Sequence, residues 1–491
     1  MDSYLVAIDN GSQSTKVLVV DQDGRVHASA RVGLRPYDTI APGRVVHPDD
    51  DVWDSIARAC TAALARFDGD RSRIVGVGLC TIRFCRAYLR ADGMLAEPLL
   101  SWMDERVGRP FDPAAVPDAR WVTSSSGYIA HRLTGERTDA SANLQGVWPI
   151  DTRSWRWPAD PAAYEATGMP RTMLFELRDP GEELGRITAD AAAATGLPEG
   201  VPVFATANDK AVEALGAGVA DSRTLLLSLG TYIAAMTVGD GPEHGAAYWS
   251  NFAARPGVHL AESHGIRRGM WTISWLRRLI RPDDAADETM YGLEAVLDAE
   301  ASGVPAGSDG VAAVLDWLAP DDEPWRRGAI IGFSGAQGRA HLYRAILEGI
   351  ALTMADNADA MSAELGLHPE ALVVTGGGAA SATMRQILAD VFALPVRRAE
   401  NDDAAGIGAA ICAAVGAGVH ADWDTALRAM VRQVPAASPG ADAAAYRRLR
   451  PWHREIRTRI AELSRFAVAH GPGTEQSRSP AADAAGKGDE R

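Results

Sequence analysis

The stretch Phe204-Ala-Thr-Ala-Asn-Asp-Lys-Ala-Val-Glu-Ala-Leu-Gly-Ala-Gly218 decides how this chain is organised. A short apolar run at residues 201–204 leads into it, and its second half is rich in small residues. The pattern predicts a strand, a turn and a helix, with Asp209 and Lys210 at the turn. A carboxylate placed there can take a proton from a bound hydroxyl group. The alternative is that Asp209 only caps the helix that follows.

An upstream segment has a related design. Residues 4–8 and 17–20 are apolar, and the polar sequence Asp9-Asn-Gly-Ser-Gln-Ser-Thr-Lys16 lies between them. This arrangement predicts a β-hairpin, followed by a third strand at residues 25–32. Backbone N–H groups in such a turn, together with its Ser and Thr hydroxyls, can form a site for an anion. A plain Asn-Gly hairpin is the alternative.

A downstream segment repeats this design. Residues 224–236 form an apolar run that is broken by Leu227-Ser-Leu-Gly-Thr231, which resembles the earlier turn Ile8-Asp-Asn-Gly-Ser12. The likeness predicts an internal duplication in which each half opens on an anion-binding hairpin. We expect one domain over residues 1–220 and a second over residues 221–466.

A triple glycine marks the second half. The apolar run 371–375 predicts a strand that leads into Gly376-Gly-Gly378, and a helix is expected at residues 382–392 with Ser381 as its cap. Glycines there let the backbone approach a flat ligand such as adenine. The run 404–419, rich in Ala and Gly, predicts a further helix that packs beside this unit.

Two more candidates for ligand contact lie in the first half. Arg83 follows a buried strand predicted at residues 74–79, and α/β proteins commonly bind ligands at the carboxyl ends of their strands. Trp102 can stack on the apolar face of a sugar. The alternatives are a surface salt bridge for Arg83 and ordinary packing for Trp102. Residues 52–67 and 120–133 are predicted to be helices from their periodicity.

The composition is that of an ordinary soluble globular protein with two domains, since 491 residues are too many for one core. The net charge of −15 argues against a nucleic acid or an anionic membrane as partner, because both require a basic surface. Four cysteines without metal-type spacing and the lack of a signal-peptide pattern predict a cytoplasmic location. The tail 467–491 has few bulky apolar residues and is predicted to be disordered.

Lysine is used sparingly. Of 49 basic residues only three are lysines, Lys16, Lys210 and Lys487. Lys487 lies in the tail, whereas Lys16 and Lys210 fall in two of the motifs above. A compact ammonium differs from a planar guanidinium at a phosphate or hydroxyl site. This placement supports a ligand-binding role for both motifs.

Together these motifs resemble those of the FGGY carbohydrate kinases, the group of xylulokinase and glycerol kinase in the actin/Hsp70/sugar-kinase superfamily. The resemblance covers about residues 4–415, and its motifs occur in the family's order: Ala7-Ile-Asp-Asn-Gly-Ser-Gln-Ser-Thr-Lys16, Trp102-Met-Asp-Glu-Arg106, Asn208-Asp209, Ser228-Leu-Gly-Thr231 and Thr375-Gly-Gly-Gly-Ala-Ala-Ser381.

The resemblance implies an α/β fold of two RNase H-like domains with a cleft between them. It also implies a phosphotransferase with an alcohol group as acceptor, which moves the γ-phosphate of ATP to a hydroxyl of a ketose, polyol or related sugar with the help of Mg²⁺. The alternative is a non-catalytic protein that binds nucleotide or sugar on the same fold. A homodimer is compatible with either reading.

The family's site residues are carried over by position. They are Asp209 as general base; Asp9 for Mg²⁺; Ser12, Gln13, Ser14, Lys16, Gly230 and Thr231 around the phosphates; Gly377, Gly378 and Ser381 beside the adenosine; and Arg83, Trp102 and Lys210, with Asp209, at the sugar.

Three departures from the family pattern concern the sugar. Thr81-Ile-Arg-Phe84 keeps an arginine but lacks the polar neighbour of xylulokinases and glycerol kinases, which argues against both of their substrates. Residues 106–124 form a shorter segment than in relatives. Lys210 replaces an expected Asn or Gln, and its alternatives are a sugar contact or a pair with Asp209 or Glu213.

Overall fold

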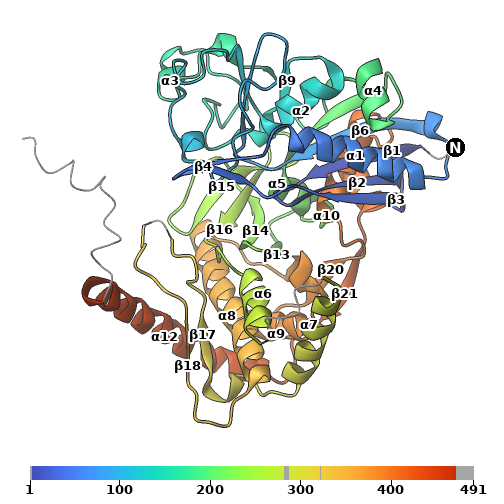
Figure 1. The fold of residues 1–491 in the computed structure, drawn as a ribbon. Coiled ribbons are helices and arrows are strands. Elements are labelled where there is room, and N and C mark those ends of the chain that lie inside the picture. The colour runs from blue at the N-terminus through green and yellow to red at the C-terminus, as the bar shows by residue number, and fades with distance from the viewer. Residues whose placement is uncertain (1–2, 281–286, 321, 472–491) are drawn as a thin grey trace, which may run out of the picture.

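Two large β-sheets, one in each lobe of Figure 1, organise the chain. The computed structural model describes residues 3–280, 287–320 and 322–471. The upper sheet has the order β11-β12-β6-β1-β2-β3, and its strands are β1 Tyr4–Asn10, β2 Ser14–Asp21, β3 Val26–Gly33, β6 Ile74–Thr81, β11 Glu183–Arg186 and β12 Pro202–Asn208. The lower sheet has the order β15-β16-β14-β13-β19-β20-β21, with β13 Thr224–Leu229, β14 Ile233–Gly239, β15 Tyr248–Phe252, β16 His259–Ser263, β19 Ala371–Thr375, β20 Val396–Ala399 and β21 Gln433–Ala437.

The two sheets share one topology. The order β3-β2-β1-β6-β12 in the upper sheet matches β16-β14-β13-β19-β20 in the lower one. In both, the first three strands in sequence are antiparallel and the last two run parallel to the first. The duplication predicted from two similar turns is therefore confirmed by the strand pairing.

The helices repeat in the same way. Three pairs occupy equivalent places between or after the matched strands: α1 Asp51–Arg66 with α8 Arg339–Leu365, α2 Ser125–Thr134 with α9 Ala382–Phe392, and α5 Asp209–Gly216 with α10 Ala404–Gly416. The remaining helices and short strands are α3 Ala162–Glu165, α4 Ala189–Thr195, α6 Trp271–Ile280, α7 Asp287–Ser302, α11 Trp423–Met430, α12 Ala443–His470, β4 Asp38–Ala41, β5 Arg44–Val46, β7 Arg86–Leu89, β8 Trp121–Ser124, β9 Thr138–Ala140, β10 Glu176–Arg178, β17 Ala312–Val314 and β18 Ala329–Ile331.

Helices α5 and α10 cross where the lobes join. A Cβ on Gly216 of α5 would collide with the carbonyl oxygen of Ala404 in α10, and a Cβ on Gly408 of α10 would collide with that of Val212 in α5. Only glycine permits such an approach of two backbones. The two helices therefore pack backbone against backbone.

The position of α10 corrects one prediction. We expected it to pack beside the triple-glycine unit of the second half. Instead it packs on β1, β6 and β12 of the upper sheet and against α5, and Figure 1 shows it beside the blue strands. Its buried face is almost wholly Ala, Gly and Ile, which suits the close covering of a sheet. Residues 404–416 thus lie in the second half of the sequence but pack in the first lobe. The domain boundary between residues 220 and 221 stays a prediction.

Two further predictions need revision. The helix expected at residues 120–133 begins only at Ser125, because β8 precedes it and the Ser124 side chain accepts hydrogen bonds from the backbone N–H groups of Ser126 and Gly127. Residues 467–470, which were expected to belong to a disordered tail, are the last residues of α12. The rest of that tail, from residue 472, lies outside the described residues. Within the described ranges, no helix is both long and apolar enough to cross a membrane.

The crossing of α5 and α10 can be tested by stability. We expect Gly408→Ala to lower the free energy of unfolding by about 1–3 kcal/mol, because the added methyl group must push two backbones apart. The matched control is Gly292→Ala, since Gly292 is also helical but a Cβ there meets nothing within 4 Å. It should be neutral or slightly stabilising. Equal denaturation midpoints for both variants would contradict this view of the crossing.

Candidate active site

Asp209 is the first residue of α5 and directly follows β12. The cap of α5 is Asn208, whose side-chain oxygen accepts a hydrogen bond from the backbone N–H of Ala211 at 3.1 Å. Asp209 is thus free of the capping role that the sequence left open. Its Oδ1 atom is buried, and within the described residues it has no hydrogen-bond partner. A buried carboxylate oxygen without a partner is rare and requires an explanation.

The first turn joins β1 to β2, where Asp9 and Lys16 are paired across the hairpin. Lys16 makes an ion pair with Asp403, the residue before α10. Ser14 Oγ accepts a hydrogen bond from Arg31 at 2.9 Å, and the Ser12 carbonyl accepts one from the Tyr37 hydroxyl at 3.0 Å. These contacts shape a turn in which Gln13 is exposed.

Asp9 lies in an unfavourable electrostatic setting. Burial, opposed by Lys16 and reinforced by Asp209, raises its pKa to about 7. No side-chain hydrogen bond to its carboxylate is found among the residues described. Those residues contain no cluster of three or more acidic, His or Cys side chains that can hold a metal. Mg²⁺ often uses only one or two carboxylates together with phosphate oxygens and water, so a single Asp9 fits that ion.

The second turn and the triple glycine lie next to each other in the lower lobe. Strands β13 and β19 run parallel, with Ser228 opposite Thr375. Gly230 and Thr231 follow one strand, and Gly377 follows the other. Backbone N–H groups of Met270 and Gly269 donate to the carbonyls of Gly230 and Thr231, at 3.1 and 2.7 Å.

Gly376, Gly378 and Ser381 lie in the connection between β19 and α9. Gly376 has a φ of +79°, and a side chain at Gly378 would contact Met270. Ser381 caps α9 by accepting from the backbone N–H of Met384 at 2.9 Å, and its hydroxyl also donates to Asp298 at 2.5 Å. A cap at this position was predicted, whereas the Asp298 contact was not.

Arg83 reaches from the upper lobe to the lower one. Its guanidinium makes two hydrogen bonds to Glu262 of β16, at 2.9 and 3.1 Å, and lies 4.8 Å from the ring centre of Trp249. Burial opposes its charge, but Glu262 outweighs this and raises the Arg83 pKa. The neighbouring Phe84 has a φ of +63°, a strained backbone conformation that is concentrated at functional sites. The sequence indicated Arg83 as a site residue. It gave no signal for Glu262 and Trp249, because both lie far from Arg83 in the chain.

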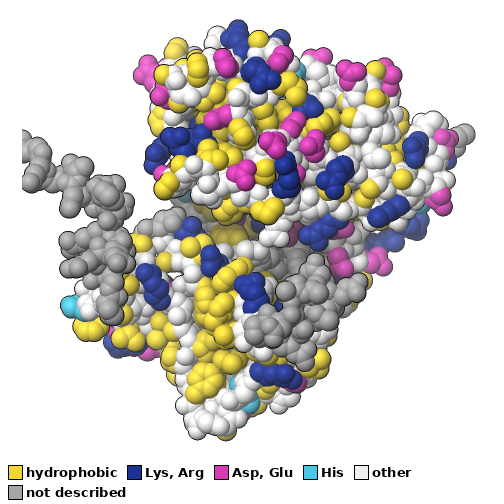
Figure 2. Space-filling view, in the orientation of Figure 1, with side chains coloured by type: hydrophobic (Ala, Val, Ile, Leu, Met, Phe, Trp, Pro, Cys, Tyr) yellow, Lys and Arg dark blue, Asp and Glu magenta, His cyan; other side chains and the backbone are white. Residues whose placement is uncertain are grey.

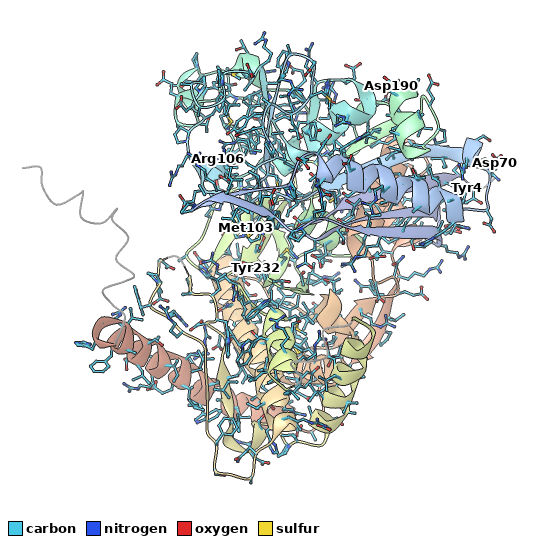
Figure 3. The ribbon with its side chains drawn as sticks, in the orientation of Figure 1. Tyr4, Asp70, Met103, Arg106, Asp190 and Tyr232 are labelled. Carbon is cyan, nitrogen blue, oxygen red and sulfur yellow. The ribbon has the colours of Figure 1, made fainter. Side chains whose placement is uncertain are left out.

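Trp102 lies on an exposed loop, with 48% of its surface accessible, beside the exposed Met103. Figure 3 shows Met103 in the upper lobe above Tyr232 in the lower one, and Figure 2 shows the surface hollowed between the lobes. Trp102 thus belongs to the loop that borders this hollow on the upper side. Its contact with a sugar stays a prediction.

Lys210 is turned toward the lower lobe. Its ammonium donates to Glu213 at 2.9 Å and to the Ser228 hydroxyl at 2.7 Å. Of the alternatives that the sequence left open, the pair with Glu213 is therefore present. The described contacts do not test whether Lys210 also meets a sugar.

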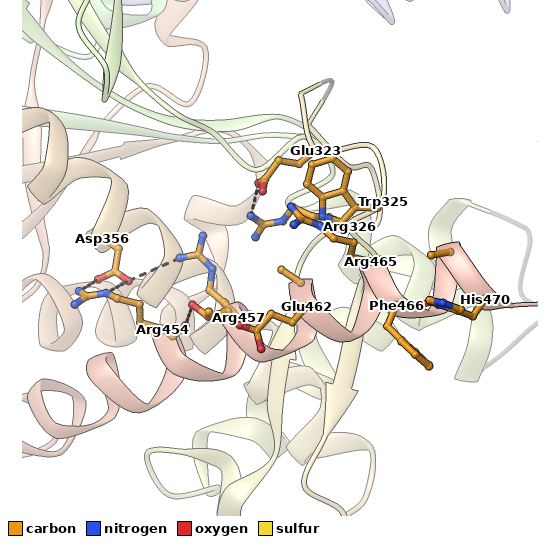
Figure 4. A pocket seen from close by; sticks show the side chains of 13 residues that line it. Glu323, Trp325, Arg326, Asp356, Arg454, Arg457, Glu462, Arg465, Phe466 and His470 are labelled. Atoms are coloured by element: carbon orange, nitrogen blue, oxygen red, sulfur yellow. Dashed lines mark hydrogen bonds and ion pairs between the residues drawn. The ribbon is translucent and has the colours of Figure 1, made fainter. Parts of the chain in front are cut away.

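Two cavities are found in the lower lobe. One of about 690 Å³ adjoins the Arg83–Glu262 pair and is lined in part by Tyr232, Trp249 and Glu262. The other, of about 800 Å³, follows α12 away from the predicted site residues (Figure 4). Its arginines are already engaged: Arg454, for example, donates to Asp356 at 2.7 Å.

Family models and known relatives match most of the chain. Two models of the FGGY family of carbohydrate kinases match the chain, that of the N-terminal domain over residues 4–112 and 98–216 and that of the C-terminal domain over residues 225–417. The chain is 46% identical over 432 residues to the uncharacterized sugar kinase YgcE of Escherichia coli (strain K12), which covers 87% of this chain and 88% of that protein. It is 28% identical over 474 residues to the autoinducer-2 kinase of Enterobacter sp. (strain 638), covering 86% and 87%.

The fold has close counterparts among solved structures. The xylulose kinase from Rhodospirillum rubrum superimposes with a TM-score of 0.81 at 24% identity, over 94% of this chain and all of that one. This likeness confirms the predicted fold class. The chain belongs to the FGGY family of carbohydrate kinases, and it is therefore a phosphotransferase that uses ATP as donor and an alcohol group of a small sugar as acceptor.

Proposed function

We propose that this enzyme phosphorylates an uncharged ketose or polyol, with Asp209 as the general base. The observation that carries the proposal is the buried Oδ1 atom of Asp209, which has no hydrogen-bond partner within the described residues. An acceptor hydroxyl that donates its hydrogen bond to this atom would supply the missing partner. The same contact would orient the hydroxyl oxygen for attack and receive its proton during transfer.

The two turns are assigned to the phosphates. Ser12, Gln13, Ser14 and Lys16 would approach from the upper lobe and Gly230 and Thr231 from the lower one. Gly377, Gly378 and Ser381 would border the adenosine. This assignment is supported by the pairing of β13 with β19, which places the second turn beside the triple glycine.

Asp9 is the proposed contact for Mg²⁺, directly or through water. Its carboxylate is free of side-chain hydrogen bonds within the described part of the chain. The ion, when bound, neutralises charge on the transferring phosphate. Lys16 would add a positive charge on the same hairpin, at the position paired with Asp9. Approach of the two lobes would exclude water and so limit hydrolysis of ATP.

The charge balance around Arg83 favours a neutral acceptor. Glu262 neutralises Arg83, so a carboxylate on the substrate would find Arg83 already paired with another carboxylate. The pair still offers donors and acceptors for sugar hydroxyls, while Trp249 and Phe84 supply apolar surface. Trp102 and Lys210 are retained as further sugar contacts.

The alternative of a non-catalytic binding protein on the same fold is set aside, because the chain belongs to the carbohydrate kinase family and keeps Asp9 and Asp209. We further propose a cytoplasmic enzyme, supported by four buried cysteines that are all free thiols. The net charge of −15 supports the expectation of neither nucleic acid nor membrane as partner. The homodimer stays a prediction.

The role of Asp209 is tested by Asp209→Asn. We expect sugar-dependent ADP release to fall by about 10²–10⁴-fold, because an amide cannot accept the proton, while ATP binding measured by calorimetry stays unchanged. The acceptor is first identified by screening pentuloses, hexuloses, polyols and aldonates. Asp190→Asn is the control, since Asp190 is exposed at the first turn of α4, and Figure 3 shows it well away from Met103 and Tyr232. Unchanged turnover in Asp209→Asn would remove it from the mechanism.

The acceptor preference is tested at Glu262. We expect Glu262→Gln to lower kcat/KM for the neutral acceptor about 10–100-fold, because Arg83 loses its charged partner and its fixed orientation. The KM for ATP should not change. A wild-type enzyme that phosphorylates only aldonates would show that the proposed neutral substrate is wrong.

A further inference from the structure

Helix α5 carries a second carboxylate one turn after Asp209. Glu213 reaches out of the helix to the lower sheet. Its Oε1 atom accepts hydrogen bonds from the Thr375 hydroxyl at 2.7 Å and from the Ser228 hydroxyl at 2.8 Å. Its Oε2 atom accepts one from the Lys210 ammonium at 2.9 Å. One side chain of the upper lobe is thus held by three donors, two of them in the lower lobe.

The two hydroxyls mark the ends of two neighbouring strands. Ser228 and Thr375 lie opposite each other on the parallel strands β13 and β19. Two residues further along the chain come Gly230 in one case and Gly377 in the other. Glu213 therefore connects α5, which begins with Asp209, to the ends of the two strands that lead into the second turn and the triple glycine.

The pair is charged although it is largely enclosed. Burial opposes ionisation, but Lys210 and the hydroxyl donors outweigh it and keep the Glu213 pKa below its usual range. Glu213 likewise raises the pKa of Lys210. A buried ion pair of this kind contributes little net stability, and apolar residues of similar volume often replace it without loss. The pair instead specifies the orientation of the two side chains, because each hydrogen bond fixes an angle as well as a distance.

A second contact holds the start of the same helix. Asn208, the cap of α5, donates to Asn251 of β15 at 3.1 Å. The residue before Asp209 and the residue one turn after it are therefore both bonded to the lower lobe.

We propose that Glu213, charged and oriented by Lys210, is a positioning residue that sets Asp209 at a defined place relative to the second phosphate turn and the triple glycine. Its carboxylate oxygens are engaged by Lys210, Ser228 and Thr375, so Glu213 is assigned no contact with the reactants. It acts on the rate by fixing the helix that bears the base, and the inference rests on the proposed role of Asp209. A displacement of about 1 Å in such a geometry costs about 10²-fold in rate.

The test replaces the pair by apolar residues, with Lys210→Met and Glu213→Leu in one protein, beside the single variant Glu213→Gln. We expect the double variant to melt close to the wild-type temperature, with kcat lower by about 10–100-fold and the KM for ATP within about threefold of wild type. The sugar KM is compared in Glu213→Gln, which keeps Lys210, and it should also stay within about threefold of wild type. The matched control is Glu455→Gln, which removes an exposed pair with Arg459 on α12. It should leave all three constants unchanged.

Epistasis separates positioning from a merely structural role. If Glu213 acts through Asp209, adding Glu213→Gln to Asp209→Asn should cause no further loss of kcat. Wild-type kcat in the apolar double variant would overturn the proposal. A raised sugar KM with kcat retained in Glu213→Gln would also overturn it, because that result indicates a direct contact of Glu213 with the substrate. If Asp209→Asn itself leaves turnover unchanged, the proposed function fails and the positioning role fails with it. If Asp209→Asn is inactive and the apolar variant is fully active, only the positioning role fails.

Discussion

The contact on which the rest of the structure depends is the crossing of α5 and α10 at the joint between the lobes. Gly216 and Gly408 let one backbone lie directly on the other, with no side chain between them. Each helix follows the last of the five matched strands of its own half, so the crossing joins the two copies of the duplicated unit at equivalent points. Asp209 begins one of these helices, and Asp403, the partner of Lys16, immediately precedes the other. The close approach of two backbones therefore brings the proposed base and the first phosphate turn to the same joint.

Around this joint, charge links the lobes. Arg83 is bonded to Glu262, and Glu213 is bonded to Ser228 and Thr375, so each lobe holds the other through carboxylates that are buried or largely buried. Such pairs add little to stability, because the cost of removing both ions from water offsets their attraction. They do specify geometry. In an enzyme whose chemistry consists mainly of alignment and charge neutralisation, geometry of this kind determines the rate. Asp209 Oδ1, which lacks a hydrogen-bond partner among the residues described, contrasts with these bonded carboxylates.

Local patterns predicted much of the fold and part of the site. The hairpin around Lys16 and the strand that leads into Gly376 follow from apolar runs that stop at Gly and hydroxyl residues, and such signals lie within a few residues of one another. The partners Glu262, Asp403 and Tyr37 carried no comparable signal. Glu262 is one polar residue in an ordinary short strand, and its distance from Arg83 in the chain hides their contact. The packing of α10 was also predicted wrongly. An Ala- and Gly-rich helix can cover any sheet closely, so its composition does not tell which sheet it covers.

The sequence by itself determined that two similar halves each open on a polar hairpin turn, that an acid stands at the start of a small-residue helix, and that the motifs have the order of a sugar kinase. These features depend on residue type and short spacing, which the chain displays directly. Only the tertiary structure decided that Asn208 rather than Asp209 caps the helix, that Arg83 is neutralised by Glu262, and that Lys210 and Glu213 bind the ends of two strands in the other lobe. Those outcomes depend on which distant segments meet, and that is set by packing of the whole chain around the α5–α10 crossing.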